Sequence, residues 1–370
     1  MSLKRETFLA QIGNRKEEHV GAINTPIYLS TAYRHEGIGL NKGYDYTRTG
    51  NPTRQILEEA IAELEKGDRG FACSSGMSAI LLVFSLFKSG DHIIASRDLY
   101  GGSFRLFEFI EKQQGITFSY WEEENETLDG LITEQTKAIF IETPTNPLMK
   151  ETDLTAIHQV AKKHNLIFIV DNTFYTPYIQ RPIEDGADIV IHSATKYLGG
   201  HNDVLAGLVV SKGEEIGEQL FHYHNGAGAV LSPFDSWLLM RGLKTLALRM
   251  RQHEQNAKAV VQFLNNHDAV ERVYYAGRGG MVSFDLKNDQ WVSTFLRSIE
   301  LFVFAESLGG VESFITYPST QTHMDIPKEV REEYGLTDKL LRISVGIEHA
   351  EDLIADLDQA LKKCVAVQTL

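Results

Sequence analysis

The chain has 370 residues, 43% of them apolar and 10% aromatic, which is enough to form two lobes with separate cores. Its 36 basic and 50 acidic residues give a net charge of −14, which argues against nucleic acid or an anionic membrane surface as a partner. The only cysteines are Cys73 and Cys364, so a disulfide framework and a Cys-x-x-Cys site are excluded, and a reducing cytosol is expected.

No targeting or membrane segment is expected either. The residues after Met1 contain no apolar run typical of a signal peptide, and the longest apolar stretch, residues 79–87, is too short to cross a bilayer. A soluble, cytoplasmic protein is therefore predicted.

Residues 1 to about 60 show little regular periodicity and are predicted to form an extended arm that ends in a turn. Tyr46 and Arg48 are two residues apart, so in an extended segment they point the same way and offer donors to one phosphate. A surface linker is the alternative that composition alone favours. Residues 54–64 then carry apolar side chains at helical spacing and are predicted to be an amphipathic helix.

The next pattern is that of an anion site between a strand and a helix. A strand at residues 70–73 is followed by small residues, among them Ser75, Gly76 and Met77, and then by an apolar helix. Free N–H groups and the positive end of the helix dipole favour a phosphate at such a turn. The same residues are also common where they only cap a helix.

Two turns that follow predicted strands carry further candidate residues. A strand at residues 91–96 leads to Tyr100 and two glycines, which suits a ring stacked on a planar cofactor, although a core tyrosine is the alternative. Strands at residues 116–120 and 138–141 follow. The second ends in a Pro-rich turn with Asn146, either a ligand or a simple turn former.

Two short apolar strands, residues 167–171 and 187–192, carry the most informative side chains. The first ends in Asp171, and Lys196 comes just after the second. A lysine in such a place is usually solvated, but an acid at the end of the preceding strand matches the requirements of pyridoxal 5'-phosphate (PLP). The carboxylate keeps the ring nitrogen protonated, and the lysine holds the aldehyde as a Schiff base.

Strands and helices that alternate in this way, with a further strand at residues 205–210, predict a mostly parallel sheet covered by helices. Ligands bind such sheets at the carboxyl ends of the strands. The chain has several histidines near this region, but no acidic residues accompany them at metal-ligand spacing, so no metal is predicted.

The last third of the sequence predicts a smaller lobe. A long helix at residues 234–265 links to strands at residues 281–285 and 341–345, and a helix at residues 350–363 closes the lobe. Arg342 alternates with apolar neighbours in the second strand. Its planar fork suits a substrate α-carboxylate, and a surface ion pair is an equal alternative.

Three motifs together resemble one family. They are Val-Asp-Asn-Thr-Phe at residues 170–174, Ser-Ala-Thr-Lys-Tyr at residues 193–197 and Gly-Gly-His at residues 199–201. They are similar to the Cys/Met-metabolism family of PLP-dependent enzymes, and the resemblance covers about residues 26–348. The connection between Tyr275 and Gly280 is shorter than is usual in that family.

The resemblance implies fold type I of the PLP-dependent transferases, an α/β fold with a mostly parallel sheet in a large domain and a smaller α+β carboxy-terminal domain. The implied divisions are an arm at residues 1–55, a PLP-binding domain at residues 56–232, and a linking helix with the carboxy-terminal domain at residues 233–370.

The resemblance also implies roles for individual residues. The catalytic ones are Lys196, Tyr100 and Asp171. The other cofactor contacts are Ser75, Gly76, Met77, Asn146, Thr173, Ser193 and Thr195, with Tyr46 and Arg48 reaching the phosphate of a neighbouring subunit. The substrate contacts are Arg342, Ser307, Glu306, Arg105 and Asp45. A homodimer of active sites within a homotetramer follows from the shared phosphate site.

The reaction implied is γ-replacement on O-acetylhomoserine with cysteine to give cystathionine in methionine biosynthesis, with sulfide as a second acceptor that gives homocysteine. Residues 46–49 lack the second arginine of enzymes that use succinyl esters, which favours the acetyl ester. A cystathionine γ-lyase or β-lyase is the alternative, and a PLP-binding regulator without catalysis is a further one.

Overall fold

The computed structural model describes residues 3–17, 19–122 and 127–367. The chain forms two compact units. Unit 1 comprises Met1–Lys88, Lys137–Ile139 and Leu154–Ala247, and unit 2 comprises Ser89–Thr136, Phe140–Asp153 and Leu248–Leu370. The domain limits predicted from the sequence, at residues 55 and 232, stay a prediction.

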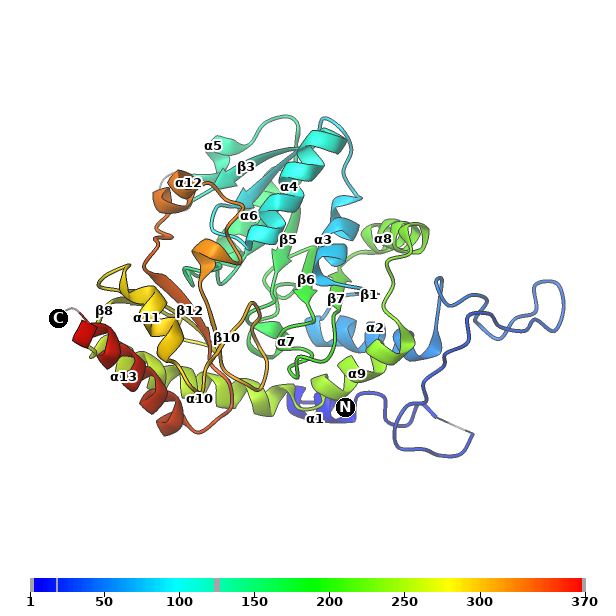
Figure 1. Cartoon of the computed structure of the whole chain (residues 1–370). Helices are drawn as coiled ribbons and strands as arrows, with labels where there is room; N and C mark the ends of the chain where they lie inside the picture. Colours follow the sequence, from blue (N-terminus) through cyan, green and yellow to red (C-terminus); the bar gives the residue numbers. More distant parts are fainter. Residues whose placement is uncertain (1–2, 18, 123–126, 368–370) are drawn as a thin grey trace. The chain divides into compact units, whose positions relative to one another are not determined.

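The core of unit 1 is a sheet whose strands are buried on both faces. The strands lie in the order β1 (Arg69–Cys73), β7 (Gly207–Ser211), β6 (Ile189–Ser193) and β5 (Ile167–Asp171), seen in blue and green in Figure 1. β5 and β6 are parallel, whereas β7 is antiparallel to both of its neighbours. β4 (Thr136–Glu142) is divided between the units. Their apolar, β-branched composition suits strands covered on both faces.

Helices cover both faces of this sheet. A Cβ on Gly207 of β7 would meet Ser75 at the start of α3 (Gly76–Phe84), whereas a Cβ on Gly67, just after α2 (Pro52–Glu65), would meet Val210. Because neighbouring strand residues face opposite ways, α2 and α3 lie on opposite faces. The remaining helices of unit 1 are α6 (Leu154–Lys163), α7 (Thr176–Ile179), α8 (Glu214–Ala227) and α9 (Pro233–Leu243).

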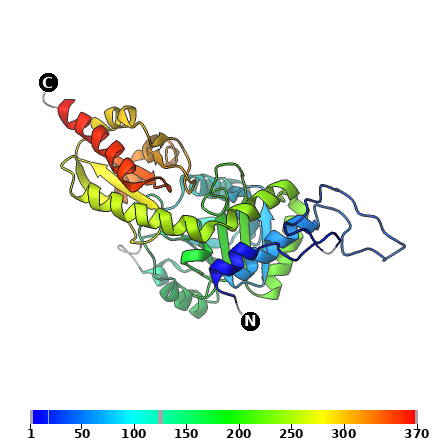
Figure 2. The same ribbon diagram turned by 90° about the horizontal axis from the view of Figure 1, so that it is seen from below.

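The amino-terminal segment of unit 1 is a short helix followed by loops. α1 (Arg5–Gln11) lies in the part predicted to be irregular, and its seven residues are too few for a clear helical period. Figures 1 and 2 show the loops of residues 19–50 extending away from the sheet of unit 1. Several large apolar side chains on these loops are exposed, namely Val20, Ile23, Leu29, Ile38 and Leu40. We call residues 19–50 the arm.

Unit 2 contains a small group of strands and a separate sheet. β3 (Thr117–Trp121) pairs in parallel with β2 (His92–Ser96), and β2 lies next to β4. α4 (Gly101–Gln114) and α5 (Leu128–Leu131) accompany these strands. A five-stranded sheet has the order β10 (Val303–Phe304), β11 (Phe314–Thr316), β12 (Leu340–Ser344), β9 (Met281–Leu286) and β8 (Val270–Tyr274).

One face of the five-stranded sheet forms the second core. Leu341, Ile343 and Val345 belong to it, which confirms the alternation predicted for this strand. The helices of this part are α10 (Leu246–Asn265), α11 (Trp291–Ser298), α12 (Lys328–Glu333) and α13 (Ala350–Val367), with a 3-10 turn at Pro318–Thr320.

The prediction of one long helix at residues 234–265 was wrong. The chain forms α9 and α10 with a turn between them, in which Thr245 N–H donates to the carbonyl of Gly242 at 3.1 Å. The apolar spacing continues through the turn, so periodicity alone does not reveal the break. α4 and α8 were not predicted from the sequence. The predicted fold class is confirmed.

Both cysteines are free and buried. Among the residues that the structure describes, none of the helices combines the length and the apolar character needed to cross a membrane.

Candidate active site

The carboxyl ends of β5 and β6 carry the predicted acid and lead to the predicted lysine. Asp171 ends β5, and its Cα partner on β6 is Ile191, which in turn pairs with Val209 of β7. Paired residues of neighbouring strands point to the same face, and so do Val209 and Gly207, because they are two positions apart. Gly207 faces α3, so Asp171 also lies on the face that α3 covers. Lys196 follows the end of β6 by three residues. The acid, the lysine-bearing turn and the start of α3 therefore gather at one edge of the unit 1 sheet.

Asp171 is held by Thr173. Its Oδ1 accepts from the Thr173 N–H at 3.0 Å, and the Thr173 hydroxyl also bonds the carboxyl. Thr173 Oγ1 in turn accepts from the Ser193 N–H at 2.8 Å, which ties the ends of the two strands together. Burial raises the pKa of Asp171, and the hydrogen bonds from Thr173 partly oppose this. A cation beside this carboxylate would remove the cost of burying its charge.

The turn that carries Lys196 is fixed through its backbone. The Lys196 N–H donates to the Ser193 carbonyl at 3.2 Å, and its carbonyl accepts from the Gly200 N–H at 2.8 Å. Thr195 Oγ1 accepts from the Ala206 N–H at 3.0 Å, next to β7. The Lys196 side chain is half-buried. The backbone thus places this amine without depending on the side chain itself.

The start of α3 has the features of an anion site. Ser75 caps the helix by accepting from the Ser78 N–H, and the Ser78 hydroxyl accepts from the Ser75 N–H at 2.9 Å. Within the described part of the chain, the N–H groups of Gly76 and Met77 have no acceptor. A Cβ on Gly76 would lie 2.8 Å from Ser193, so only glycine allows the helix start to approach the end of β6 so closely.

Tyr46 and Arg48 lie on the exposed arm of unit 1. Arg48 Nη1 donates to the backbone carbonyl of Asn225 and, at 3.1 Å, to its Oδ1, in the last turn of α8. The Arg48 guanidinium also lies 5.7 Å from the centre of the Tyr46 ring. The two side chains are therefore neighbours, as their spacing predicted. Asp45 is exposed and contacts His35 at 2.9 Å.

In unit 2, Arg342 is buried rather than paired with an acid at the surface. Only 2% of the residue is exposed. Nη1 donates to Asn146 Oδ1 at 2.7 Å and Nη2 to Thr316 Oγ1 at 3.3 Å. These acceptors are neutral, so an anion that reaches this guanidinium would gain a charge-assisted contact. Of the two alternatives for Arg342, the surface ion pair is excluded.

Asn146 is itself held by His323. The backbone carbonyl of Asn146 lies 2.9 Å from His323 Nε2, and the Thr322 hydroxyl lies 2.7 Å from His323 Nδ1. Burial, reinforced by Arg342, lowers the pKa of His323 to about 3, so the ring is neutral. Because a carbonyl can only accept, the proton of the neutral ring is on Nε2.

Tyr100 precedes α4 in unit 2. Its N–H donates to Glu142 Oε2 at 2.9 Å, at the end of β4. A Cβ on Gly102 would lie 2.4 Å from the Tyr100 ring, so the glycine leaves room for the ring to lie against the helix start. Burial raises the pKa of the Tyr100 hydroxyl, and the Glu306 carboxylate adds to this shift. The hydroxyl therefore stays protonated at neutral pH.

The other predicted substrate residues of unit 2 are less buried. Arg105 is exposed and forms an ion pair with Asp325, while Glu306 is exposed and Ser307 half-buried.

Comparisons with known proteins show the family of this chain. The profile of the family described as Cys/Met metabolism PLP-dependent enzyme matches residues 6–362. The chain belongs to this family. A cystathionine gamma-synthase/O-acetylhomoserine (thiol)-lyase of Bacillus subtilis (strain 168) is 61% identical over 98% of this chain and 97% of that protein. A cystathionine gamma-synthase of Haemophilus influenzae is 57% identical over 96% and 97%.

Solved structures agree as well. The crystal structure of cystathionine gamma synthase from Xanthomonas oryzae pv. oryzae in complex with aminoacrylate and cysteine is similar at a TM-score of 0.96, with 40% identity over 99% of this chain and 100% of that chain. A cystathionine gamma-lyase and cystathionine beta-lyases are also similar in sequence. The chain is therefore a PLP-dependent enzyme of cystathionine metabolism, and the family alone does not distinguish synthase from lyase.

The residues of unit 1 fit this cofactor. A phosphate needs donors, and the free N–H groups of Gly76 and Met77 stand at a helix amino terminus. A ring nitrogen that must stay protonated needs a buried acid, and Asp171 is one. An aldehyde needs an amine, and Lys196 is held at the end of the adjacent strand.

Sequence reasoning missed some residues that support these groups in the enzyme. Glu142 anchors the start of α4, while Thr316 and His323 contact Arg342 and Asn146 respectively. A buried acid at a strand end was the available signal for Glu142, as it was for Asp171. Nothing local in the sequence marks Thr316 or His323, because both act on residues far away in the chain.

The close approach at Gly76 gives a first testable prediction for the enzyme. Gly76→Ala would push the start of α3 away from Ser193, because its Cβ would lie 2.8 Å from that side chain. Overpacking of this kind costs about 1–3 kcal/mol, so we expect PLP affinity to fall on the order of 10-fold. Equilibrium titration of the apoenzyme with PLP measures this effect.

The matched control is Gly226→Ala, in α8, where a Cβ would meet nothing within 4 Å. This variant should bind PLP as the wild type does. Equal affinity in the Gly76→Ala and wild-type proteins would contradict the assignment of the helix start as the phosphate site.

Proposed function

We propose that the enzyme catalyses γ-replacement on O-acetylhomoserine with cysteine, giving cystathionine and acetate, and that it accepts sulfide as a second thiol, giving homocysteine. The observation that carries this proposal is the 61% identity, over nearly the whole chain, to the Bacillus subtilis protein named for both activities. Position 49 is a threonine whose hydroxyl donates to Asn225 Oδ1 at 3.1 Å. It offers no positive charge for a succinyl carboxylate, which favours the uncharged acetyl group.

In this proposal the unit 1 residues hold the cofactor. Ser75, Gly76 and Met77 bind the phosphate, with Ser193 and Thr195 beside them. Asp171, oriented by Thr173, keeps the ring nitrogen protonated. PLP bound in this way supplies an electron sink for the charge that develops when a substrate proton is removed.

Lys196 has two roles in the proposal. It would hold the cofactor, and its neutral amine would accept and return protons at the substrate. It accepts the proton from the substrate Cα. In the overall exchange the Cγ–O bond to the acetyl group breaks, the Cγ–S bond forms, and the thiol proton leaves with the acetate.

The unit 2 residues act on the substrate in this proposal. Arg342 binds the α-carboxylate, because its fork is held in one orientation by Asn146 and Thr316. Tyr100 offers its ring for stacking, and the amide of Asn146 is a further donor for the cofactor. Arg105, Glu306, Ser307 and Asp45 stay predicted substrate contacts.

We also propose that two copies of the chain form each pair of active sites and that two such pairs form a tetramer. The support is the arm, whose large apolar side chains are exposed in the single chain. Several large apolar side chains exposed on one segment favour an interface, because burying them against a second copy removes their apolar surface from water. Tyr46 and Arg48 would then serve the phosphate of the second copy.

A cystathionine γ-lyase or β-lyase is the second candidate. The observation that favours it is the similarity to lyases, at 49% identity for a Bacillus subtilis gamma-lyase and 48% for Lactococcus lactis beta-lyases. A regulator without catalysis has less support, since the lysine, the acid and the arginine are all present and are held by defined hydrogen bonds.

Product analysis decides between these candidates. We expect purified enzyme given O-acetylhomoserine and cysteine to release cystathionine, detected by mass spectrometry. In a second sample with cystathionine alone, rapid release of cysteine and 2-oxobutanoate would support the γ-lyase, and homocysteine with pyruvate the β-lyase. Inactivity in both samples would favour the third candidate, a PLP-binding regulator without catalysis.

A further inference from the structure

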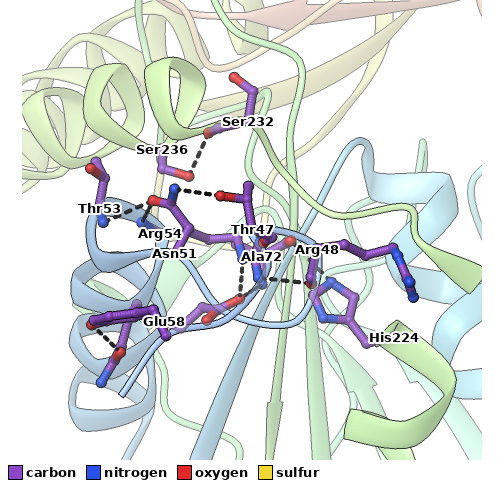
Figure 3. A network of polar contacts seen from close by, with 12 residues as sticks. Thr47, Arg48, Asn51, Thr53, Arg54, Glu58, Ala72, His224, Ser232 and Ser236 are labelled. Atoms are coloured by element: carbon purple, nitrogen blue, oxygen red, sulfur yellow. Dashed lines mark hydrogen bonds and ion pairs between the residues drawn. The ribbon is translucent and has the colours of Figure 1, made fainter. Parts of the chain in front are cut away.

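Arg54 is a buried arginine that the proposed reaction does not use. It lies in the first turn of α2, and its side chain is only 1% exposed. Nη1 donates to the carbonyl of Thr47 at 2.8 Å and Nη2 to the carbonyl of Arg48 at 3.1 Å. Nε donates to Glu58 Oε1 at 3.2 Å (Figure 3). All three nitrogens of this guanidinium therefore have acceptors, and two of these are backbone carbonyls of the arm.

The arm segment held in this way carries exposed side chains on a fixed backbone. Asn51 Nδ2 also donates to Thr47 Oγ1, at 3.2 Å, and Asn51 Oδ1 caps α2 (Figure 3). In contrast, Tyr46 is 46% exposed. An anchored backbone below exposed donors is the arrangement expected of a segment that is ordered before it meets its ligand, because less entropy is then lost on binding.

Arg48 keeps donors available for such a ligand. Among the described residues, only its Nη1 has an acceptor, the side chain and carbonyl of Asn225. This contact with Asn225 of α8 holds the guanidinium of Arg48 in place. Nη2 and Nε remain available to donate to an anion. Asn225 follows His224, which holds the Ala72 carbonyl through Nε2 at 3.1 Å (Figure 3).

Glu58, the ion-pair partner of Arg54, connects Arg54 to the sheet of unit 1. Glu58 Oε1 accepts from the Ala72 N–H of β1 at 3.1 Å, besides accepting from Arg54. The contacts of Arg54 therefore connect the arm to a strand of the core. A lysine could keep the charge but could not serve three acceptors in one plane.

We propose that Arg54 is a positioning residue that orders Tyr46 and Arg48 to bind the cofactor phosphate of a second copy of this chain. This inference rests on the proposed function of the arm. The proposal predicts that Arg54 affects the active site of the other copy, although the Arg54 side chain is buried within its own chain.

The first test is a titration of apoenzyme with PLP, followed by the absorbance of the bound cofactor. We expect Arg54→Met to weaken PLP binding on the order of 10-fold or more, and Arg54→Lys to weaken it less. Arg69→Met is the matched control, because Arg69 lies in β1, the strand that leads to α3, and pairs with Glu218 at 2.6 Å rather than with the arm. Wild-type PLP affinity in Arg54→Met would overturn the proposal.

The second test separates an effect on the other copy from an effect on the chain's own site. Arg54→Met and Lys196→Ala chains are co-expressed, and mixed dimers are isolated with two different tags. In these dimers one site has Lys196 from the first chain and an intact arm from the second. We expect this site to bind PLP with wild-type affinity and to restore turnover above the sum of the two separate variants.

One outcome of the second test counts against the proposal. If the intact site of the mixed dimer binds PLP as weakly as the Arg54→Met homodimer, Arg54 acts only within its own chain. If Arg54→Met does not fold, the same comparison is made with Glu58→Gln, which keeps an acceptor for the Ala72 N–H but weakens the hold on Arg54. Because the PLP titration uses no substrate, its result does not depend on whether the reaction is a synthase or a lyase reaction.

Discussion

Lys196→Ala is expected to lower kcat by about 10²–10⁴-fold or more, because both the covalent hold on the cofactor and the proton carrier are lost. The fold should change little. The backbone hydrogen bonds that hold this turn, from the Lys196 N–H to the Ser193 carbonyl and from the Gly200 N–H to the Lys196 carbonyl, are kept by alanine. Steady-state kinetics and thermal unfolding of the same preparation measure the two effects.

A matched control and a rescue make this prediction specific. Lys212→Ala removes an exposed lysine that contacts Asp68 at 2.8 Å just after β7, and it should leave kcat unchanged. Added methylamine should restore part of the activity of Lys196→Ala, since a small free amine can carry the proton. Full turnover by Lys196→Ala without an added amine would refute the assignment of this lysine.

Arg342→Ala is expected to raise KM on the order of 100-fold while PLP remains bound, because two charge-assisted hydrogen bonds to a carboxylate contribute about 3 kcal/mol or more. The guanidinium is buried and oriented by neutral acceptors, Asn146 Oδ1 at 2.7 Å and Thr316 Oγ1 at 3.3 Å. Initial rates over a range of O-acetylhomoserine concentrations give KM and kcat separately. The absorbance of the bound cofactor reports whether PLP is retained.

The control for Arg342 is Thr316→Val, which removes one of its acceptors but keeps the guanidinium. It should raise KM only a few-fold, as expected for loss of one hydrogen bond of about 1 kcal/mol. Arg342→Lys should lie between these variants, since it keeps the charge without the fork. A colourless Arg342→Ala protein, or one with normal KM, would mean that Arg342 holds the structure or the cofactor rather than the substrate.

His323 supports Arg342 indirectly, through Asn146. It is buried, neutral, and bound to the Asn146 carbonyl, and Asn146 in turn accepts from Arg342. The orientation of the arginine fork therefore depends on a residue that itself carries no charge. Asn146 and Thr316 are neutral acceptors, so these two hydrogen bonds orient the guanidinium of Arg342 without themselves cancelling its charge.

Local patterns were sufficient for the elements of unit 1 that carry the predicted cofactor residues. Asp171 and Lys196 follow short apolar runs, and those runs form β5 and β6 as predicted. Strand, small residues and helix at residues 69–84 likewise form β1, the turn and α3. These predictions succeeded because the period of apolar residues and the residues that end an element act over a few positions only.

The long-range contacts of the candidate residues in unit 2 were beyond such patterns. Asn146 and Arg342 are 196 positions apart in the chain, and His323 contacts Asn146 across 177 positions. Sequence alone left Arg342 equally divided between the surface and a substrate site, and only its burial removed the first alternative. The break between α9 and α10 was missed for a related reason, since the apolar spacing passes through it.

What the sequence determined by itself is therefore many of the strands and helices, the resemblance to the family, and which side chains stand at or just after the ends of β5 and β6. What only the tertiary structure decided is which distant groups hold the candidate residues, as His323 does for Asn146 and Thr316 for Arg342. The physical reason is range. Backbone preferences and side-chain periodicity act between near neighbours, whereas a buried hydrogen bond depends on the path that brings two remote segments together.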